Sequence, residues 1–361
     1  MPKSGRKTTP PSRGPATLPR AARAALRAWY LAHQRALPWR TAPSLYKTVV
    51  SEFMLQQTQV ATVLPRFARW LEQFPDFAAL AAAREEVVVR AWEGLGYYRR
   101  ARRLHALARA LAARPAPPRT PAEWMELPGV GPYTAAAITS IAFGEPIAVV
   151  DGNVARVLAR LYGDETLYPD GSRAARAFAP AAQTLLDRAH PGDHNQAMME
   201  LGATVCTPRT PRCPVCPLAR GCVAAAQGNA ESLPRFTRVK TTRVMVTRVW
   251  IERDGALLLH RRPGEARRLA GICELPDAST VPGIRRAARP LAVKRRGIVN
   301  QLITETIYHA SLRASAPDPA NGGANGLLWV AWEKLPGVTL SGPHRRWIGE
   351  LREREGAEDA R

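Results

Sequence analysis

The stretch LPGVGPYTAAAI, residues 127–138, sets two glycines and two prolines before a helix-forming run. Gly129 and Gly131 permit a positive φ and a close approach of the backbone, and Pro132 suits the first turn of a helix. The stretch therefore predicts a hairpin between two helices, the second of which Gly144 ends. Backbone N–H groups at such a helix N-terminus bind phosphate readily, although a connection of this kind is often only a tight turn. We expect the backbone of Gly129, Val130 and Gly131 to form this phosphate-binding site.

The composition favours a large, basic protein with a polyanionic partner. The chain has 361 residues, of which 46% are hydrophobic, and 52 Lys and Arg against 30 Asp and Glu leave a net charge of +22. Nucleic acid is the first candidate for the partner, and an anionic membrane surface is the alternative. No apolar run approaches the ~18 residues of a membrane span, so we expect no membrane association. The basic N-terminus lacks the apolar segment of a signal peptide, so we expect a cytoplasmic protein.

Changes of composition divide the chain into segments. The region after residue 227 loses its alanine-rich helical periodicity, and RVMVTRVWIERDGALLLHRR (243–262) predicts two strands joined at Asp254-Gly255. The predicted segments are a disordered basic arm (1–24), an all-α domain (25–227), a linker (228–243), a small α+β domain (244–345) and a charged tail (346–361).

Four of the five cysteines fall in CTPRTPRCPVCPLARGC, residues 206–222, with the spacing C-x6-C-x2-C-x5-C. A compact loop rich in proline can bring four thiolates to one centre, which indicates a bound metal. Zinc and a [4Fe–4S] cluster both accept four thiolates, so the spacing leaves the two open. Cys273 stands apart and is expected to fill space in an apolar core. The predicted ligands are Cys206, Cys213, Cys216 and Cys222.

Glu52 lies near the end of an apolar helical run that begins at Ser44. One continuous helix would bury the Gln57 amide, so we expect a break at 55–57, with Thr58 capping a new helix and Pro65 breaking it again. Burial and the negative end of the helix dipole would raise the pKa of Glu52, as a general acid requires.

Asp151 is predicted in the opposite environment. It precedes the helical run NVARVLARLY, in the position of an N-cap, where the dipole favours the ionised carboxylate. A protonated Glu and an ionised Asp suit cleavage of a glycosidic bond through an oxocarbenium-like state.

Ordered motifs now resemble a known family. The LPGVG hairpin, the aspartate of DGNVARVLAR and the four-cysteine loop are similar to the helix–hairpin–helix DNA glycosylases that carry an iron–sulfur cluster. Within these, LPWR, SEFMLQQTQV, GLGYY and LGATVC resemble the MutY-type adenine DNA glycosylases, over about residues 25–226. The resemblance implies a multidomain fold: an all-α helix–hairpin–helix glycosylase domain with an iron–sulfur cluster loop, and a C-terminal α+β Nudix-like domain. Residues 283–297 lack the glutamates of a Nudix box, so we expect no nucleotide hydrolysis.

The resemblance implies a monomeric, nucleoid-associated enzyme of base excision repair with one [4Fe–4S] cluster. It would flip adenine mispaired with 8-oxoguanine or guanine out of double-stranded DNA and hydrolyse its N-glycosidic bond. The implied roles are Glu52 as acid, Asp151 as stabiliser of the sugar cation, Asn153 and Tyr133 as their supports, Trp39, Arg40 and Gln196 as adenine pocket, Gln57 and Tyr97 as wedges in the base stack, the four cysteines as cluster ligands, and Tyr308 and His309 as the 8-oxoguanine recognition loop.

Two positions separate the alternatives. Endonuclease III-like relatives carry a Schiff-base lysine where this chain has Tyr133, and they lack a match to Glu52. The resemblance therefore implies a monofunctional enzyme rather than a bifunctional glycosylase/lyase. A non-catalytic iron–sulfur DNA-binding protein is a second alternative. The presence of both Glu52 and Asp151 argues against it, because a protein without catalytic activity would need neither carboxylate. In the recognition loop, TETIYHASL (304–312) has Ile307 and Tyr308 where family members have Phe and Ser.

Overall fold

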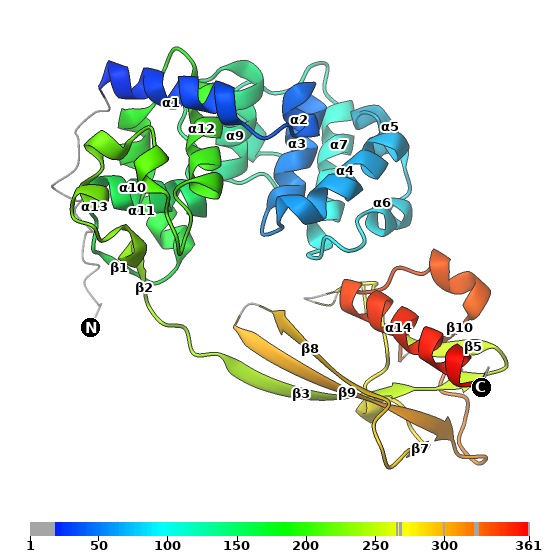
Figure 1. Cartoon of the computed structure of the whole chain (residues 1–361). Coiled ribbons are helices and arrows are strands. Elements are labelled where there is room, and N and C mark those ends of the chain that lie inside the picture. Colours follow the sequence, from blue (N-terminus) through cyan, green and yellow to red (C-terminus); the bar gives the residue numbers. More distant parts are fainter. Residues whose placement is uncertain (1–18, 265, 267–268, 299, 321–324, 360–361) are drawn as a thin grey trace, which may run out of the picture. The chain divides into compact units, whose positions relative to one another are not determined.

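The computed structural model (Figure 1) describes residues 19–359 apart from 265, 267–268, 299 and 321–324. Its backbone contacts divide the chain into two units. The helical unit holds the residues up to Ala81 and Ala106–Arg238, and the sheet unit holds Ala82–His105 and the residues from Val239 onward.

The helical unit is predominantly α-helical, as predicted, but it also contains one pair of two-residue strands. Helix α7 (Arg99–Ala112) contributes residues to both units. The other elements of the helical unit are α1 (Arg20–His33), α2 (Pro38–Thr41), α3 (Leu45–Leu55), α4 (Val60–Gln73), α5 (Phe77–Ala82), α8 (Pro121–Met125), α9 (Pro132–Phe143), α10 (Gly152–Tyr162), α11 (Gly171–Leu185), α12 (Pro191–Thr204), α13 (Val223–Ala226) and the paired strands β1 (Leu167–Tyr168) and β2 (Arg235–Phe236).

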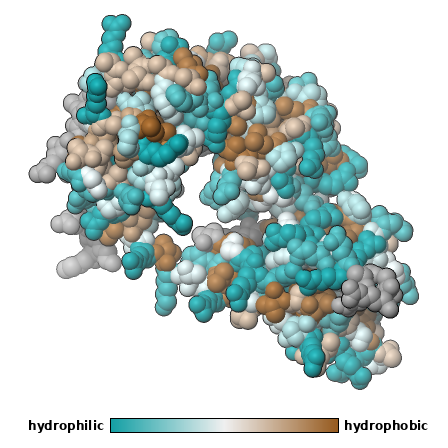
Figure 2. Space-filling view, viewed as in Figure 1, coloured by the Kyte–Doolittle hydropathy of each residue, from teal (hydrophilic) through white to brown (hydrophobic). Residues whose placement is uncertain are grey.

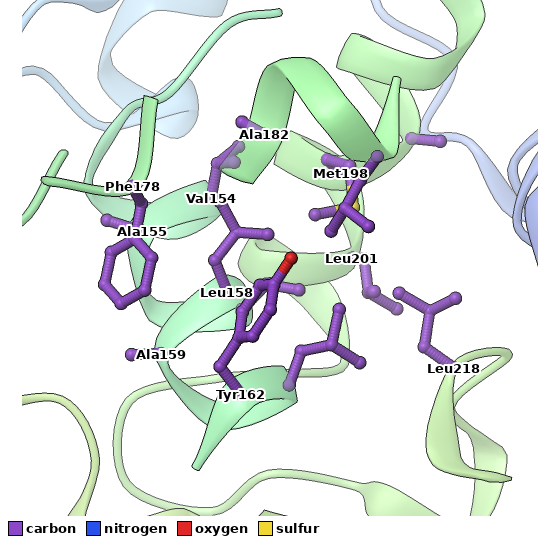
Figure 3. Packing of buried hydrophobic residues seen from close by; sticks show 14 of the residues in the cluster. Val154, Ala155, Leu158, Ala159, Tyr162, Phe178, Ala182, Met198, Leu201 and Leu218 are labelled. Atoms are coloured by element: carbon purple, nitrogen blue, oxygen red, sulfur yellow. The ribbon is translucent and has the colours of Figure 1, made fainter. Parts of the chain in front are cut away.

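Helix α10 lies at the centre of one core of this unit. It packs against α11 and α12, and α12 also packs against α1 and α9. Figure 3 shows side chains of α10, among them Val154 and Leu158, beside Phe178 of α11 and Leu201 of α12. Because these residues are almost completely buried, the core fixes the start of α10, where Asp151 lies.

The hairpin predicted at LPGVG joins α8 to α9. Thr120 and Glu123 form a capping box at the start of α8, Pro132 opens α9, and Gly144 ends it with φ +72°. In the hairpin Gly129 has φ +81°, whereas Gly131 has the extended φ of −101° and acts as the N-cap. Only the first of the two glycines therefore uses the left-handed region.

The predicted break after Glu52 is confirmed, but its details differ. Helix α3 ends at Leu55, and α4 begins with Gln59, not Thr58, as its N-cap. Pro65 does not break the chain, because it lies inside α4. The predicted second break is wrong: the buried contacts of Phe67 and Trp70 hold the helix together beyond the proline.

The sheet unit contains two four-stranded sheets. One sheet has the order β10–β5–β4, with β6 also on β5, and the other has β3–β9–β7, with β8 also on β9. Strand β3 runs parallel to β9, while β7 and β8 run antiparallel to it. The elements are α6 (Glu85–Ala91), β3 (Thr242–Trp250), β4 (Glu252–Arg253), β5 (Ala256–Arg261), β6 (Cys273–Glu274), β7 (Ile284–Arg286), β8 (Ala292–Ile298), β9 (Gln301–Leu312), β10 (Leu327–Ala331) and α14 (Gly342–Asp359).

The predicted turn at Asp254-Gly255 is confirmed. The two residues have φ of +49° and +71°, and Arg253 pairs with Ala256 across the hairpin. Positive φ at both central positions is the mark of the tight hairpin turns that match the twist of the strands. Cys273, predicted to fill an apolar core, is 1% exposed and packs in one.

Residues 82–105 join the sheet unit through polar contacts. The Tyr98 hydroxyl donates to the Leu340 carbonyl at 2.8 Å, and Arg345 forms an ion pair with Glu93 at 2.5 Å. The sequence predicts residues 82–105 in the all-α domain, because helical segments of that domain lie on both sides of them in the sequence. The structure instead assigns them to the sheet unit.

A buried ionic network ties the strands of the sheet unit to α14. Glu305 of β9 accepts a hydrogen bond from Arg248 of β3 at 2.6 Å, and Arg296 of β8 lies 2.5 Å from its other oxygen. Glu274 of β6 accepts from Arg296 at 3.1 Å, and His344 of α14 lies 3.3 Å from Glu305. Burial alone would raise the pKa of Glu305, but His344 and the two arginines lower it to about 2. The carboxylate therefore stays ionised within the protein.

Segment boundaries differ from those predicted. Residues 1–18 of the predicted arm lie outside the described residues, and α1 already begins at Arg20. The predicted linker 228–243 contains β2, which pairs with β1. The predicted charged tail from residue 346 is part of α14, because Trp347, Ile348 and Leu351 are buried.

The visible surface is mostly hydrophilic, with apolar residues in separate patches (Figure 2). Among the helices that the structure describes, we find none with the length and hydropathy needed to cross a membrane.

Candidate active site

Glu52 is a buried acid in the last turn of α3. Its side chain packs where α3 meets α9, and the residue is 8% exposed. Burial raises the pKa of Glu52 to about 7; the Tyr133 hydroxyl opposes this by donating to the carboxylate, and the charge of Asp151 adds to it. The predicted environment of a general acid is therefore present, and burial is its main cause.

Tyr133, the second residue of α9, connects Glu52 with α12. Its hydroxyl lies 3.6 Å from the Met199 sulfur and also within hydrogen-bonding reach of Glu52. Burial and the two nearby carboxylates raise its pKa well above the usual value, so the hydroxyl keeps its proton. Tyr133 can therefore donate a hydrogen bond but cannot act as a base at neutral pH.

Asp151 is the N-cap of α10, as predicted. One carboxylate oxygen accepts from the Val154 N–H at 2.7 Å, and the other accepts from the Asn153 amide at 3.0 Å. The expectation that its pKa is lowered is wrong: burial raises it, and the two hydrogen bonds offset this only in part. Those donors nevertheless favour the charged form, so Asp151 is better suited than Glu52 to carry a charge.

A chain of hydrogen bonds links Asp151 to the cysteine loop. Arg156 donates to the Asn153 side-chain oxygen at 2.9 Å and to the Cys206 carbonyl at 2.9 Å. A Cβ at Gly202 would lie 2.7 Å from the Asn153 Cβ, so only glycine permits this approach of α12 to α10. Asn153 is therefore linked through Arg156 to the backbone of the loop's first cysteine.

The four predicted ligands line one cavity. Its empty space, including the part open to solvent, is about 300 Å³. Arg160 is 1% exposed and donates to the Cys206 sulfur at 3.2 Å and to the Thr207 carbonyl at 2.7 Å. Within the described ranges, no three thiol, imidazole or carboxyl side chains converge closely enough to hold a single metal ion. The cavity brings together Cys206, Cys213, Cys216 and Cys222.

The predicted base pocket is partly assembled. Arg40 lies close enough to Glu52 to lower its pKa, and Trp39 packs edge-on against Phe67 at 5.0 Å. Gln196 is half-buried on α12, one turn before Glu200. The structure therefore brings Arg40 to Glu52, and it places Gln196 on the same helix face as Glu200.

Glu200 is a residue that the sequence analysis missed. It is completely buried and accepts hydrogen bonds from Arg35 at 2.7 Å and from Arg40 at 2.9 Å. Burial alone would raise its pKa, but these guanidinium groups lower it. The signal was an acid between Met198 and Leu201 on a buried helix face, which requires a cationic partner.

The two predicted wedge residues share an unusual backbone. Gln57, exposed between α3 and α4, has φ +56°, and Tyr97, which is 51% exposed, has φ +49°. They belong to different units. Non-glycine residues rarely adopt this region, and such strain concentrates at functional positions.

The predicted recognition loop is not a loop. Tyr308 and His309 lie within strand β9, paired with Val249 and Trp250 of β3. The expectation of a turn is wrong because β9 pairs on both sides through this segment. The Arg286 guanidinium lies over the Tyr308 ring at 4.2 Å, and His309 is exposed. His309 is therefore the more accessible of the two.

Comparison with known proteins adds independent findings. Residues 50–180 match the HhH-GPD superfamily, described as base excision DNA repair proteins. Adenine DNA glycosylase of Rattus norvegicus is 34% identical over 88% of this chain and 75% of its own, and that of Mus musculus is 46% identical over 89% and 76%. A solved structure of a thermostable thymine-DNA glycosylase is 25% identical, with a TM-score of 0.50 over 57% of this chain and 95% of that chain.

Removing the ionisable group at Glu52 is expected to stabilise the protein at alkaline pH. The pKa is about 7 in the folded protein and roughly 4.3 in an unfolded chain. The folded state therefore holds its proton more tightly, and this stabilising contribution is lost progressively as the pH rises from about 4.3 to about 7. Glu52→Gln should match the native chain at pH 4 and exceed its unfolding free energy by roughly 3.5 kcal/mol at pH 8.

Urea unfolding of the full chain at both pH values measures this difference. Glu72→Gln, an exposed glutamate of α4, is the matched control and should change little at either pH. Equal effects of Glu52→Gln at pH 4 and pH 8 would contradict the raised pKa.

Proposed function

This chain belongs to the adenine DNA glycosylases of the HhH-GPD superfamily of base excision DNA repair proteins, and from that membership we propose that it excises adenine from mispairs in duplex DNA. The observation that carries the proposal is the pairing of a buried Glu52, with a pKa of about 7, and the capped carboxylate of Asp151. Two carboxyl groups in these states serve the two needs of glycosidic cleavage, a proton for the leaving group and a negative charge for the sugar.

The mechanism follows from these groups. Adenine flipped from the duplex would accept the proton of Glu52 on a ring nitrogen as the N-glycosidic bond lengthens. Asp151 stabilises the positive sugar that results, and Asn153 holds its carboxylate in place. Tyr133 hydrogen-bonds Glu52 and carries no amine. A Schiff base with the sugar needs such an amine, so hydrolysis without strand cleavage is the proposed outcome.

The pocket for the base would be built around α2. Arg40 and Trp39 lie there, and Glu200 fixes the Arg40 guanidinium from α12. A fixed cation near Glu52 also limits how far the acid's pKa rises, because it favours the ionised form. We propose that this pocket receives the flipped adenine, with Gln196 at its α12 side.

The four-cysteine cavity fits a [4Fe–4S] cluster better than a single ion. Zinc binds four sulfurs at about 2.3 Å, which requires close convergence, whereas a cluster distributes its ligands over four irons. The four thiols line one pocket, and among the described residues no three of them converge on a single point. We propose that the four cysteines hold the cluster, which would order the loop and, through Cys206 and Arg156, the position of Asn153.

The sheet unit is the proposed reader of the base opposite adenine. Its mixed strands and the helix α14 are compatible with a Nudix-like fold. The exposed His309 on β9 offers a ring N–H to an oxidised purine, and Arg286 beside Tyr308 supplies charge for the backbone. We propose 8-oxoguanine or guanine as the opposite base and a monomer as the acting form.

Replacing the acid tests the proposed reaction. Glu52→Gln should lower the single-turnover rate of adenine excision by about 10²–10⁴-fold while duplex binding stays intact. In the native chain the rate should fall as the pH rises above about 7, because Glu52 loses its proton. Glu72→Gln is the control, and a Glu52→Gln rate within twofold of native would reject the assignment.

Replacing a ligand tests the cluster. Cys216→Ala should lose bound iron and acid-labile sulfide, measured by elemental analysis and by visible absorption of the purified full chain. Cys273→Ala, which changes a cysteine of the sheet unit, should keep both. Native protein that contains one zinc and no labile sulfide would refute the cluster.

Replacing His309 tests the reader. His309→Ala should reduce the preference for adenine opposite 8-oxoguanine over adenine opposite guanine by roughly two- to tenfold, the effect of one neutral hydrogen bond. Single-turnover excision from the two duplexes gives the ratio. His33→Ala, an exposed histidine of α1, is the control. An unchanged ratio in His309→Ala would remove β9 from the recognition of the damaged base.

A further inference from the structure

The turn between α6 and α7 combines three residues with positive φ. Gly94, Gly96 and Tyr97 all have positive φ, at +86°, +68° and +49°. Glycine adopts this region freely, but a bulky residue such as Tyr97 does so only where its surroundings impose it. The strained residue is also 51% exposed, so burial of its own ring does not hold it there.

The buried guanidinium of Arg100 donates hydrogen bonds to backbone carbonyls of this turn. Its Nη2 donates to the Leu95 carbonyl at 2.9 Å and to the Gly96 carbonyl at 3.2 Å. The Trp92 indole N–H donates to the same Gly96 carbonyl at 3.1 Å, and the Arg100 backbone N–H donates to the Tyr97 carbonyl at 2.8 Å. Three carbonyls in succession are therefore fixed by two neighbouring residues.

The same guanidinium lies over two rings. The Arg100 Cζ is 5.4 Å from the centre of the Trp92 ring and 5.5 Å from that of Tyr97. Trp92 is completely buried, so the three groups form a series from the interior to the surface. Burial lowers the pKa of Arg100 to about 10, which still leaves the group charged at neutral pH.

We propose that Arg100 is a positioning residue that presents the Tyr97 ring as a stacking platform for a nucleobase at the site where a base has left the duplex. The inference rests on the proposed function, because an unstacked base exists only in a duplex that has been opened. Aromatic side chains stack on bases of any sequence, and a ring that is already oriented loses little freedom when it does so. The strained backbone directs the ring outward, and the guanidinium supplies the plane and the donors that keep it there.

Lysine is the informative replacement for Arg100. It keeps the charge and N–H donors but lacks the planar group that lies over the Trp92 and Tyr97 rings. If Arg100 acts only as a charge for phosphate, Arg100→Lys should be nearly neutral. If it acts through Tyr97, the loss should disappear once the ring is removed.

A double-mutant cycle on the full chain measures this dependence. The probe is a duplex with a tetrahydrofuran abasic analogue opposite guanine and 2-aminopurine next to it, which cannot be turned over. Arg100→Lys and Tyr97→Leu should each weaken binding by about 5- to 150-fold, the value of one stacked base, and reduce the 2-aminopurine response. The double variant should bind like Tyr97→Leu. Arg103→Lys, an exposed arginine of α7, should bind like the native chain.

Losses that multiply in the double variant would overturn the proposal, since Arg100 would then act independently of the ring. Trp92→Phe keeps a ring beneath the guanidinium but removes the N–H to Gly96, and it provides a milder variant if Arg100→Lys does not fold. It should weaken binding in the native background and not in Tyr97→Leu; an equal loss in both would likewise overturn the proposal. Failure of the proposed function has a different result, which is that the native chain binds the abasic probe no better than an intact duplex.

Discussion

Withdrawal of two carboxyl groups from water is the constraint around which the helical unit is organised. Glu52 is buried where α3 meets α9, and Asp151 is buried at the start of α10. A buried carboxyl group has a free-energy cost unless it is protonated or supplied with donors. Tyr133 and Asn153 supply those donors. The core around α10 fixes the helix that carries Asn153, and Tyr133 packs against a second cluster formed by Ala136, Ala137 and Val149. The reactive properties of the site are therefore those of a fold that keeps water from two acids.

Features with a local cause were predictable from the sequence. Asp151 as an N-cap, Gly144 as a helix end and Asp254-Gly255 as a hairpin turn each depend on residues a few positions away. The burial of Glu52 was also predictable, because the apolar stripe around it is continuous in sequence. For these elements, local chemistry and tertiary packing favour the same structure.

Features that depend on contacts between distant parts of the chain were not predictable from the sequence. Pro65 stays helical because of buried neighbours on α4, and the charged tail becomes α14 because three apolar residues in it reach the sheets. The dipole of helix α10 led to the expectation of a lowered pKa for Asp151, yet burial of the carboxyl group outweighs this effect and raises the pKa. Tyr308 and His309 were assigned to a turn from a motif, whereas β-pairing to β3 is invisible along the chain. Glu200 needed Arg35, 165 positions away, before its role was evident.

The ionic network of the sheet unit restricts how this sequence can change over evolutionary time. Losing Glu305 alone would leave two buried guanidinium groups to share the Glu274 carboxylate, and losing either arginine would take away one of the two guanidinium partners of Glu305. An apolar core of the same volume is an acceptable alternative, but no single substitution leads to it. Positions 248, 296 and 305 should therefore vary together among descendants of this chain or remain as they are. Among related sequences, this constraint would be seen as correlated substitutions on β3, β8 and β9, strands that are adjacent in the sheet although β3 is far from the other two in sequence.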